Sequence, residues 1–233
     1  MVLKAIQTTT IQDSVYKQLM EAILEGTIVP GERVTMEGLA KQLNVSIMPV
    51  REAIRKLEAN RFLTIQKRRI EINKLSIENV DQILEVRLLL ECYAAEKAAL
   101  QRRDEILDEL EELLIAMENT KEPEVYLKAN RQFHTTIYQE AKVPVMLEII
   151  DTLWERYSPY FHILLKDGRN WNAEDFVRTH RGMMAGIRRK DPKEVCKWLE
   201  KDLKEAAKML VNLLEKDQAK YKLKIHRYFT KEL

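Results

Sequence analysis

Hydrophobic residues in the first part of the chain recur at helical spacing in three short stretches. Thr35 precedes the second stretch and Ser46 the third, and both residue types commonly cap the first turn of a helix. Apolar and polar residues then alternate over 62–66 and 69–72, which is the pattern of two short strands. Two helices joined by a short turn and followed by a hairpin predict a winged helix-turn-helix domain over residues 1–75.

From Ser76 the hydrophobic period changes to about 3.6 residues and stays there. We expect a mainly α protein in which an antiparallel six-helix bundle, residues 76–218, follows the winged domain. A basic tail, residues 219–233, ends the chain, and the alternation over 221–229 leaves open whether that part is a strand, an arm or a helix. The six helices are predicted over residues 76–99, 103–118, 123–141, 144–166, 172–189 and 192–217.

Composition places the chain among globular proteins and narrows its chemistry. Of its 233 residues 45% are hydrophobic and 33% charged, and no apolar stretch approaches the roughly 18 residues of a membrane-spanning helix. The two cysteines, Cys92 and Cys196, are 104 positions apart, which argues against a disulfide scaffold and favours a reducing cytoplasm. No glycine lies between Gly38 and Gly168, so glycine-rich phosphate-binding loops are not expected. These features predict a cytoplasmic protein with no membrane partner.

Charge is distributed unevenly along the chain. Residues 1–75 carry 12 Lys and Arg against 8 Asp and Glu, whereas residues 76–215 carry 21 against 27. Residues 216–233 are basic again, with 6 against 2. A small basic domain attached to an acidic body is typical of a nucleic-acid-binding module joined to a second function, although ordinary variation among solvated surfaces produces the same counts.

The third predicted helix carries the residues expected to read DNA. The second helix of a helix-turn-helix enters the major groove at its start, which places Arg51 and then Arg55 against base edges or phosphates. The basic cluster at the tip of the hairpin suits phosphates or the minor groove, with a solvated loop as the alternative for such residues standing alone. The expected DNA-binding residues are Thr35, Ser46, Arg51, Arg55, Lys67, Arg68 and Arg69.

The string Ser-x-x-Pro-Val-Arg-Glu-Ala that begins at Ser46, with the apolar residues around it, resembles the GntR family of bacterial transcription regulators. The chain departs from the family's pattern at Ile47, where arginine is frequent, and at Asn60, where glycine usually ends the helix. Arginines stand at 68–69, where the wing usually has a glycine. The resemblance implies a DNA-binding transcription regulator whose operator sequence is not carried over from relatives.

The predicted bundle resembles the FCD effector domain of the FadR-like subgroup, in its smaller VanR-like form with six helices. The segments that carry this resemblance are Arg87…Leu90-Glu91, residues 130–134 and Thr179-His180-Arg181. Metal-binding members use four ligands, of which this chain has asparagine for a usual aspartate and aspartate for a usual histidine. The resemblance places the ligands at Asn130, His134, His180 and Asp202.

The spacing of these four residues agrees with a metal site. Asn130 and His134 are four positions apart on one helix face, and His180 and Asp202 lie on two later helices of the bundle. Two imidazoles with oxygen ligands suit a divalent ion, with Zn²⁺ and Ni²⁺ as the first candidates. Without the family pattern, a single histidine on a helix is more often structural than a ligand.

Arg87 is a charge on an otherwise apolar helix face, where it can bind an effector carboxylate or pair with a neighbour such as Glu91. The leading interpretation is a transcription regulator that binds double-stranded operator DNA as a homodimer and an organic acid near a divalent metal ion. One alternative is the same regulator with a metal-free pocket. Another is a metal-dependent hydrolase using His134, His180 and Asp202, which leaves the winged domain unexplained and lacks an evident general base. We therefore expect no enzymatic activity.

Overall fold

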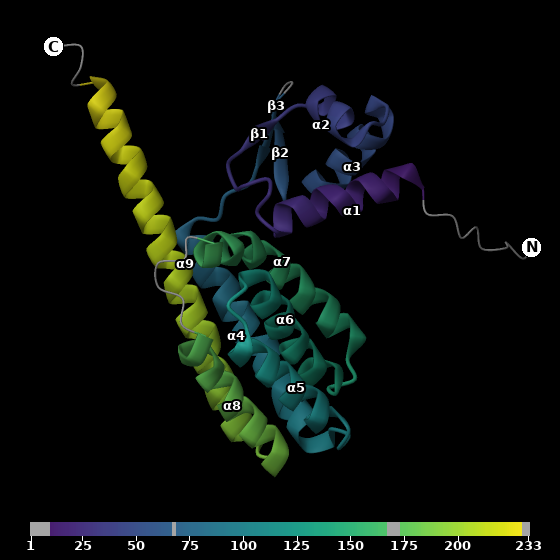
Figure 1. Cartoon of the computed structure of the whole chain (residues 1–233), viewed down its shortest axis with the longest axis vertical. Helices are drawn as coiled ribbons and strands as arrows, with labels where there is room; N and C mark the ends of the chain where they lie inside the picture. Colours follow the sequence, from purple (N-terminus) through teal and green to yellow (C-terminus); the bar gives the residue numbers. More distant parts are fainter. Residues whose placement is uncertain (1–9, 67–68, 167–172, 230–233) are drawn as a thin grey trace, which may run out of the picture. The chain divides into compact units, whose positions relative to one another are not determined.

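The computed structural model describes residues 10–66, 69–166 and 173–229 (Figure 1). The chain forms two compact units, Met1–Leu75 and Ser76–Leu233. Each unit has its own hydrophobic core. No helix in the described ranges is long and apolar enough to cross a membrane.

The N-terminal unit is a winged helix-turn-helix, as its hydrophobic pattern predicts. Its elements are α1 Ile11–Leu24, β1 Arg33–Val34, α2 Met36–Leu43, α3 Ile47–Ala59, β2 Leu63–Gln66 and β3 Arg69–Ile72. The strands form one antiparallel sheet in the order β1-β3-β2, in which Glu71 lies opposite both Arg33 and Thr64. The strand β1 is absent from the sequence prediction because two residues are too few to show an alternation.

Short polar residues define where the helices of this unit begin and end. The hydroxyl oxygen of Thr35 caps α2 by accepting a hydrogen bond from the Gly38 amide at 3.1 Å. Asn44 ends α2 in the left-handed conformation, with φ of 52°, which asparagine tolerates better than most residues. Ser46 occupies the N-cap position of α3 without a side-chain capping bond. Its hydroxyl is therefore available to a ligand at the start of α3.

One face of α3 forms the centre of the N-terminal core. Val50, Ala53, Ile54 and Leu57 are at most 1% exposed. Burial of this stripe sets the rotation of α3 about its own axis and turns the opposite face of the helix to solvent. The other elements contribute the buried residues Val15, Leu19, Met20, Ile23, Leu39, Ala40, Phe62, Leu63, Ile70 and Ile72.

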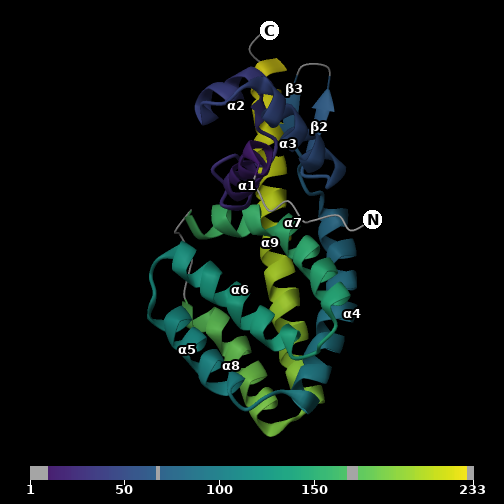
Figure 2. The ribbon, with the colours of Figure 1, turned by 90° about the vertical axis from the view of Figure 1, so that its right-hand side faces the viewer.

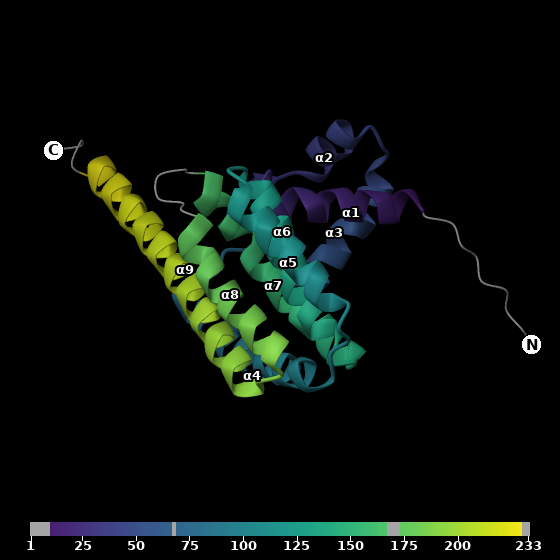
Figure 3. The same cartoon turned by 60° about the horizontal axis from the view of Figure 1, so that its bottom comes forward.

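The described part of the second unit is helical (Figure 2). Its helices are α4 Ile77–Gln101, α5 Ile106–Asn119, α6 Pro123–Gln139, α7 Pro144–Lys166, α8 Ala173–Arg189 and α9 Pro192–Phe229. The last helix packs along α4 and α8 (Figure 3). Because α9 continues to Phe229, the segment 221–229, left open by the sequence pattern, is helical and not a strand.

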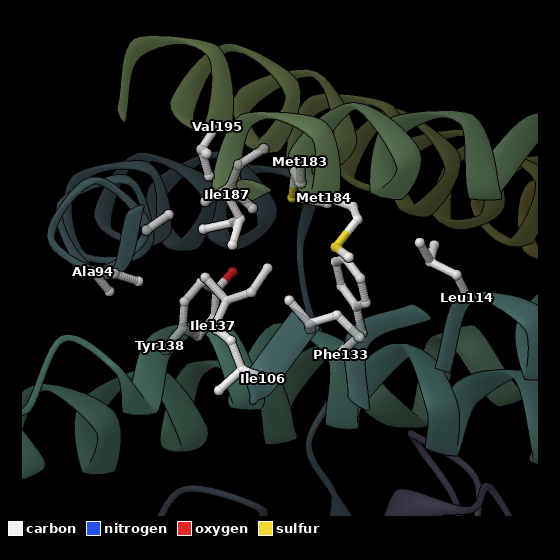
Figure 4. Close-up of a cluster of buried hydrophobic side chains, with 14 of the residues drawn as sticks. Ala94, Ile106, Leu114, Phe133, Ile137, Tyr138, Met183, Met184, Ile187 and Val195 are labelled. Atoms are coloured by element: carbon white, nitrogen blue, oxygen red, sulfur yellow. The ribbon is translucent and has the colours of Figure 1, made fainter. Parts of the chain in front are cut away.

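The core of the bundle lies between α6 and α8, with α4, α5 and α9 closing it. Figure 4 shows Phe133 and Ile137 of α6 pointing toward Met183 and Ile187 of α8. Helix α4 contributes small side chains, since Ala94, Ala95, Ala98 and Ala99 are all fully buried. These alanines let the neighbouring helices approach α4 closely.

Two glycines allow α8 and α9 to pack closely. A Cβ atom on Gly182 would lie 2.2 Å from a ring carbon of Trp198. A Cβ atom on Gly186 would lie 2.6 Å from Cγ2 of Val195 and 2.9 Å from the Val195 backbone nitrogen. Since a backbone atom cannot rotate away as a side chain can, the contact at Gly186 requires glycine.

We expect Gly186→Ala to lower the free energy of unfolding by about 1–3 kcal/mol, because the added methyl group forces α8 and α9 apart. The shift of the urea midpoint, followed by far-ultraviolet circular dichroism, measures the effect. Arg188→Ala on the same helix is the control, and its loss of one exposed ion pair with Glu111 should cost no more than about 1 kcal/mol. Equal midpoints for Gly186→Ala and the unsubstituted protein would contradict the packing argument.

Candidate metal centre and nucleic-acid interface

The solvent face of α3 carries the two arginines that the sequence assigns to DNA. Arg51 and Arg55 are both exposed and lie opposite the buried stripe of the helix. The Arg51 guanidinium contacts the sulfur of Met48 at 3.9 Å, and Nη1 of Arg55 lies 3.3 Å from a carboxylate oxygen of Glu52. Both arginines are held only by weak surface contacts, so they can turn toward a ligand at little cost.

The other predicted DNA contacts are distributed over the helix starts and the wing. Thr35 and Ser46 are exposed at the N-caps of α2 and α3, where backbone N–H groups favour an anion such as a phosphate. Arg69 is exposed at the start of β3. Lys67 and Arg68 lie outside the described residues.

Two apolar side chains at the start of α3 are not among the predicted contacts. Ile47 is 37% exposed and Met48 is 58% exposed. Exposed apolar side chains at this position are of the kind that contacts the methyl groups of thymine. The departure from arginine at Ile47 is the signal in the sequence that points to this surface.

Three helices of the second unit bring the four predicted metal ligands together. Asn130 and His134 come from α6, His180 from α8 and Asp202 from α9. Nε2 of His180 lies 2.7 Å from Oδ1 of Asn130 and 3.1 Å from Nε2 of His134. Oδ2 of Asp202 lies 3.4 Å from Nε2 of His134. Both imidazoles are 1% exposed, so the cluster is inside the bundle.

These separations match those between ligands of one metal ion. Donor atoms that each lie about 2.1 Å from an ion are roughly 3.0–3.4 Å apart when their angles at the ion are between octahedral and tetrahedral. Nε2 of His134 lies within this range of both His180 and Asp202, whereas Oδ1 of Asn130 is closer to His180, at 2.7 Å. One ligand atom from each histidine and from Asp202 lie within 4.8 Å of one another, so the residue types and their approach fit a divalent ion after rearrangement of the side chains.

A buried chain of hydrogen bonds orients His134. The Tyr138 hydroxyl donates to Oε2 of Glu91 at 2.6 Å, so its single proton is used there. Nδ1 of His134 lies 3.0 Å from the same hydroxyl oxygen and must supply the proton of that bond. The tautomer with a proton on Nδ1 leaves the Nε2 lone pair of His134 facing the cluster.

His180 is oriented by Thr179 and Asn130. The Thr179 hydroxyl donates to Oδ1 of Asp202 at 2.6 Å, and Nδ1 of His180 lies 3.4 Å from the Thr179 oxygen. Because an amide oxygen only accepts, the 2.7 Å contact with Oδ1 of Asn130 places a proton on Nε2 of His180. The lone pair on Nε2 of His134, 3.1 Å away, therefore faces a donor. A metal ion bound to Nε2 of His180 would displace this proton.

Arg87 anchors the hydrogen-bonded chain. Its Nε lies 2.5 Å from Oε1 of Glu91 and its Nη2 lies 3.3 Å from Oε2, and both residues are buried. The guanidinium also lies 4.7 Å from the centroid of the Trp154 ring and 5.2 Å from that of Tyr157. Burial opposes the charge on Arg87, but the Glu91 carboxylate outweighs it and raises the pKa of the guanidinium. Of the two roles expected for Arg87, pairing with Glu91 is confirmed.

The electrostatic environment keeps Tyr138 protonated and Asp202 ionised. Burial raises the pKa of Tyr138 well above its usual value, and the Glu91 carboxylate raises it further, so the hydroxyl stays protonated. Burial alone would raise the pKa of Asp202, but His180, His134 and Thr179 together hold it well below its usual range. Asp202 is therefore ionised.

The supporting residues Tyr138 and Thr179 are not predicted by the sequence. Tyr138 stands four positions after His134, just as Glu91 stands four positions after Arg87. This repeated spacing is a signal, but the meeting of the two pairs depends on α4 packing against α6, which no spacing within one helix reveals.

A shallow hollow lies beside the cluster. Its wall includes Tyr138, which bonds to His134, and Trp154, whose ring centroid lies 5.2 Å from that of His134. The indole nitrogen of Trp154 is buried and finds no hydrogen-bond partner in the described part of the chain. The hollow is lined by Thr135, Tyr138, Gln139, Leu147, Ile150, Asp151 and Trp154.

Two family models match the chain. The model of the gntR family of bacterial regulatory proteins matches residues 11–69, and the model of the FCD domain matches residues 82–205. A solved metal-free FCD domain is 16% identical, with a TM-score of 0.50, and covers 62% of this chain and 99% of its own. That likeness concerns the fold alone.

Curated relatives match most of the chain. The HTH-type transcriptional regulator McbR of Escherichia coli strain K12 is 30% identical over 176 residues, which are 74% of this chain and 79% of McbR. Its solved structure has a TM-score of 0.77 at 25% identity and covers 88% of this chain and 99% of that one. The uncharacterized HTH-type transcriptional regulator YdhC of Bacillus subtilis strain 168 is 31% identical over 190 residues, which are 78% of this chain and 82% of YdhC.

These matches extend over both units, so the winged helix-turn-helix and the helical domain occur together in the matched proteins. The named relatives are transcriptional regulators, which supports a regulator over the hydrolase alternative. The chain belongs to the gntR family of bacterial regulatory proteins and is a DNA-binding transcription regulator with an FCD effector domain.

Proposed function

We propose that this regulator binds a divalent ion, Zn²⁺ or Ni²⁺, through Asn130, His134, His180 and Asp202. The observation that carries the proposal is the convergence of an amide oxygen, two imidazole nitrogens and a carboxylate oxygen, 2.7–3.4 Å apart, inside the bundle. A bound divalent ion would replace the contacts among these groups with metal–ligand bonds. Neutral imidazoles and an ionised Asp202 are the forms in which they coordinate metals.

The charge of this ligand set supports an organic acid as the effector. Asn130 and the two imidazoles are neutral, so Asp202 is the only anionic ligand of the four. A divalent ion bound there keeps a net positive charge, and an ion that takes six ligands has positions left for a carboxylate. Asp202 restores the negative charge that Asn130 removes, so the ligand set keeps the single anionic ligand of the family pattern.

We further propose that the effector contacts Arg87 and the hollow beside Trp154. Glu91 takes the Nε and Nη2 donors of Arg87, which leaves the Nη1 edge of the guanidinium for a second carboxylate. Trp154 lies against both Arg87 and His134 and has a buried N–H without a bond in the described residues. A small carboxylate here would satisfy that donor.

The metal proposal is tested by the stoichiometry of Ni²⁺ binding, measured by equilibrium dialysis and elemental analysis on untagged protein. We expect His134→Ala and His180→Ala each to bind about one equivalent less than the unsubstituted protein, since the remaining ligands are too few to hold the ion. His162→Asn, which changes a histidine outside the cluster, should leave the stoichiometry unchanged. Equal stoichiometry in all four proteins would instead support a regulator with a metal-free pocket.

Tyr138→Phe tests whether the hydrogen bond that orients His134 affects metal binding separately from the ligands. It keeps all four ligands but removes the oxygen that accepts the Nδ1 proton of His134, so Ni²⁺ affinity should fall roughly 10–100-fold at unchanged stoichiometry. Unchanged affinity would mean that the chain from Arg87 to His134 does not act on the metal centre.

We propose that residues 1–75 bind operator DNA in the cytoplasm, with residues 76–218 as the effector-binding and dimerisation domain and 219–233 as a basic tail. The solvent face of α3 supplies Arg51 and Arg55 to base edges, while Ile47 and Met48 can meet thymine methyl groups. Phosphates are assigned to Thr35, Ser46, Lys67, Arg68 and Arg69.

Arg51→Ala should weaken operator binding by about 1–3 kcal/mol at fixed salt concentration, because it removes a base or phosphate contact from the recognition helix. Fluorescence anisotropy on the protein's own upstream DNA measures the affinity. Arg188→Ala, which removes an exposed arginine from the helical unit, is the matched control and should bind DNA normally. If both variants bind alike, α3 does not read the operator.

We propose that the protein acts as a homodimer through the outer face of α4. Leu89 is 70% exposed and Leu100 is 63% exposed, and with Val86 and Tyr93 they form an apolar stripe on this helix. A two-fold contact places identical stripes together, which suits a regulator whose two recognition helices read two half-sites. A second copy of the chain is therefore the expected occupant of this face.

Leu89→Glu with Leu100→Glu should give a monomer in sedimentation velocity, because two buried charges per copy would face each other across the contact. Val125→Glu on α6 replaces another exposed apolar residue and should leave the dimer intact. A dimer that survives the double change would exclude the α4 face.

A further inference from the structure

Two matching pairs of side chains face each other between α4 and α9, apart from the histidine cluster. Each helix carries a cysteine followed four positions later by a glutamate: Cys92 and Glu96 on α4, and Cys196 and Glu200 on α9. Residues four apart lie on one helix face, so each helix presents a sulfur and a carboxylate together. All four residues are half-buried.

The ligand atoms of these pairs converge. The sulfurs of Cys92 and Cys196 and a carboxylate oxygen of Glu200 all lie within 4.8 Å of one another. The sulfur of Cys196 lies 3.8 Å from Oε1 of Glu200, and the sulfur of Cys92 lies 3.9 Å from the backbone oxygen of Cys196. Glu96 is close enough to act electrostatically on both thiols.

We propose that Cys92, Cys196 and Glu200, with Glu96 beside them, form a second metal site, which takes a thiophilic ion such as Zn²⁺ or Cd²⁺. Sulfur ligands about 2.3 Å from a tetrahedral ion lie roughly 3.8 Å apart, and a sulfur and an oxygen roughly 3.5 Å. The sulfur of Cys196 and Oε1 of Glu200, at 3.8 Å, are close to this spacing, and the sulfurs and the Glu200 oxygen all lie within 4.8 Å, so closure of the side chains by up to about 1 Å brings them to ligand distance. Thiolate ligands select softer ions than the nitrogen and oxygen donors of the histidine cluster.

The two thiols and the two carboxylates interact electrostatically, although lysines, among them Lys204, surround Glu200 on its solvent side. Burial raises the pKa of the Cys92 thiol, and Cys196 and the carboxylates of Glu200 and Glu96 raise it further. Burial and the same two carboxylates raise the pKa of Cys196. Both thiols are therefore protonated in the metal-free protein, and binding one divalent ion releases two protons to solvent as two metal–sulfur bonds form.

One existing contact competes with the ion. Nζ of Lys204 lies 3.0 Å from Oε2 of Glu200, and the two side chains are 57% and 45% exposed. An exposed ion pair of this kind contributes little free energy, so Lys204 can release the carboxylate. Because the site joins residues 104 positions apart, a bound ion would hold α4 and α9 together and stabilise the helical unit.

The test is a titration of the reduced full-length protein with Cd²⁺, followed by the sulfur-to-cadmium charge-transfer absorption in the ultraviolet. We expect the band to saturate at about one equivalent, independently of protein concentration. Cys92→Ser and Cys196→Ser should each abolish high-affinity binding, whereas His134→Ala, which disrupts only the histidine cluster, should keep the band. Glu200→Gln should lower the affinity roughly 10–100-fold.

The chain has only these two cysteines, which makes the outcome decisive. If the sulfurs bind separately, each serine variant keeps half of the band, and the proposal is wrong. A band that appears only at high protein concentration would show that the ion bridges two molecules, which also overturns it. Circular dichroism of each variant, with unchanged helix content, establishes that loss of the band is not loss of the fold.

Discussion

A polar group inside a helical bundle must be paired, and this requirement organises the whole effector domain. Arg87, Glu91, Tyr138 and His134 form one continuous chain of contacts through the core, in which each group satisfies the next. An uncompensated charge at this depth would cost several kcal/mol, so no member can be placed without the others. The position of the histidine cluster therefore depends both on the packing of α4 against α6 and on the side chains of the cluster.

The architecture of both units can be predicted from the sequence because it depends on local periodicity. The stripe of Val50, Ala53, Ile54 and Leu57 implies a buried face for α3, and the structure has it. Two features could not be predicted. The strand β1 forms only because β3 offers its edge, and the extension of α9 over 221–229 carries a polar and apolar alternation that suits a strand as well as a helix.

In the candidate site, too, the residues linked by local spacing could be predicted, whereas those that act between helices could not. Asn130 and His134 are linked by spacing within α6, and the family resemblance adds His180 and Asp202, all of which the structure brings within ligand distance of one another. Thr179 and Tyr138 act between helices, so no pattern within one helix indicates their roles. At α3 the structure adds to the sequence. In the sequence, Ile47 marks the absence of an arginine that is frequent in the family. In the structure, its side chain is exposed and forms part of an apolar surface.

The glycine contacts between α8 and α9 have a mechanical consequence for the histidine cluster. His180 and Asp202 stand on these two helices, which approach so closely that a Cβ atom on Gly182 or Gly186 would collide with Trp198 or the Val195 backbone. Such close packing favours a constant separation between His180 and Asp202. Asn130 and His134 belong to α6, which meets α8 through the apolar core and through the contacts of His180. A shift of α6 relative to α8 would therefore change the geometry of the cluster, and the bond between Tyr138 and Glu91 links such a shift to α4.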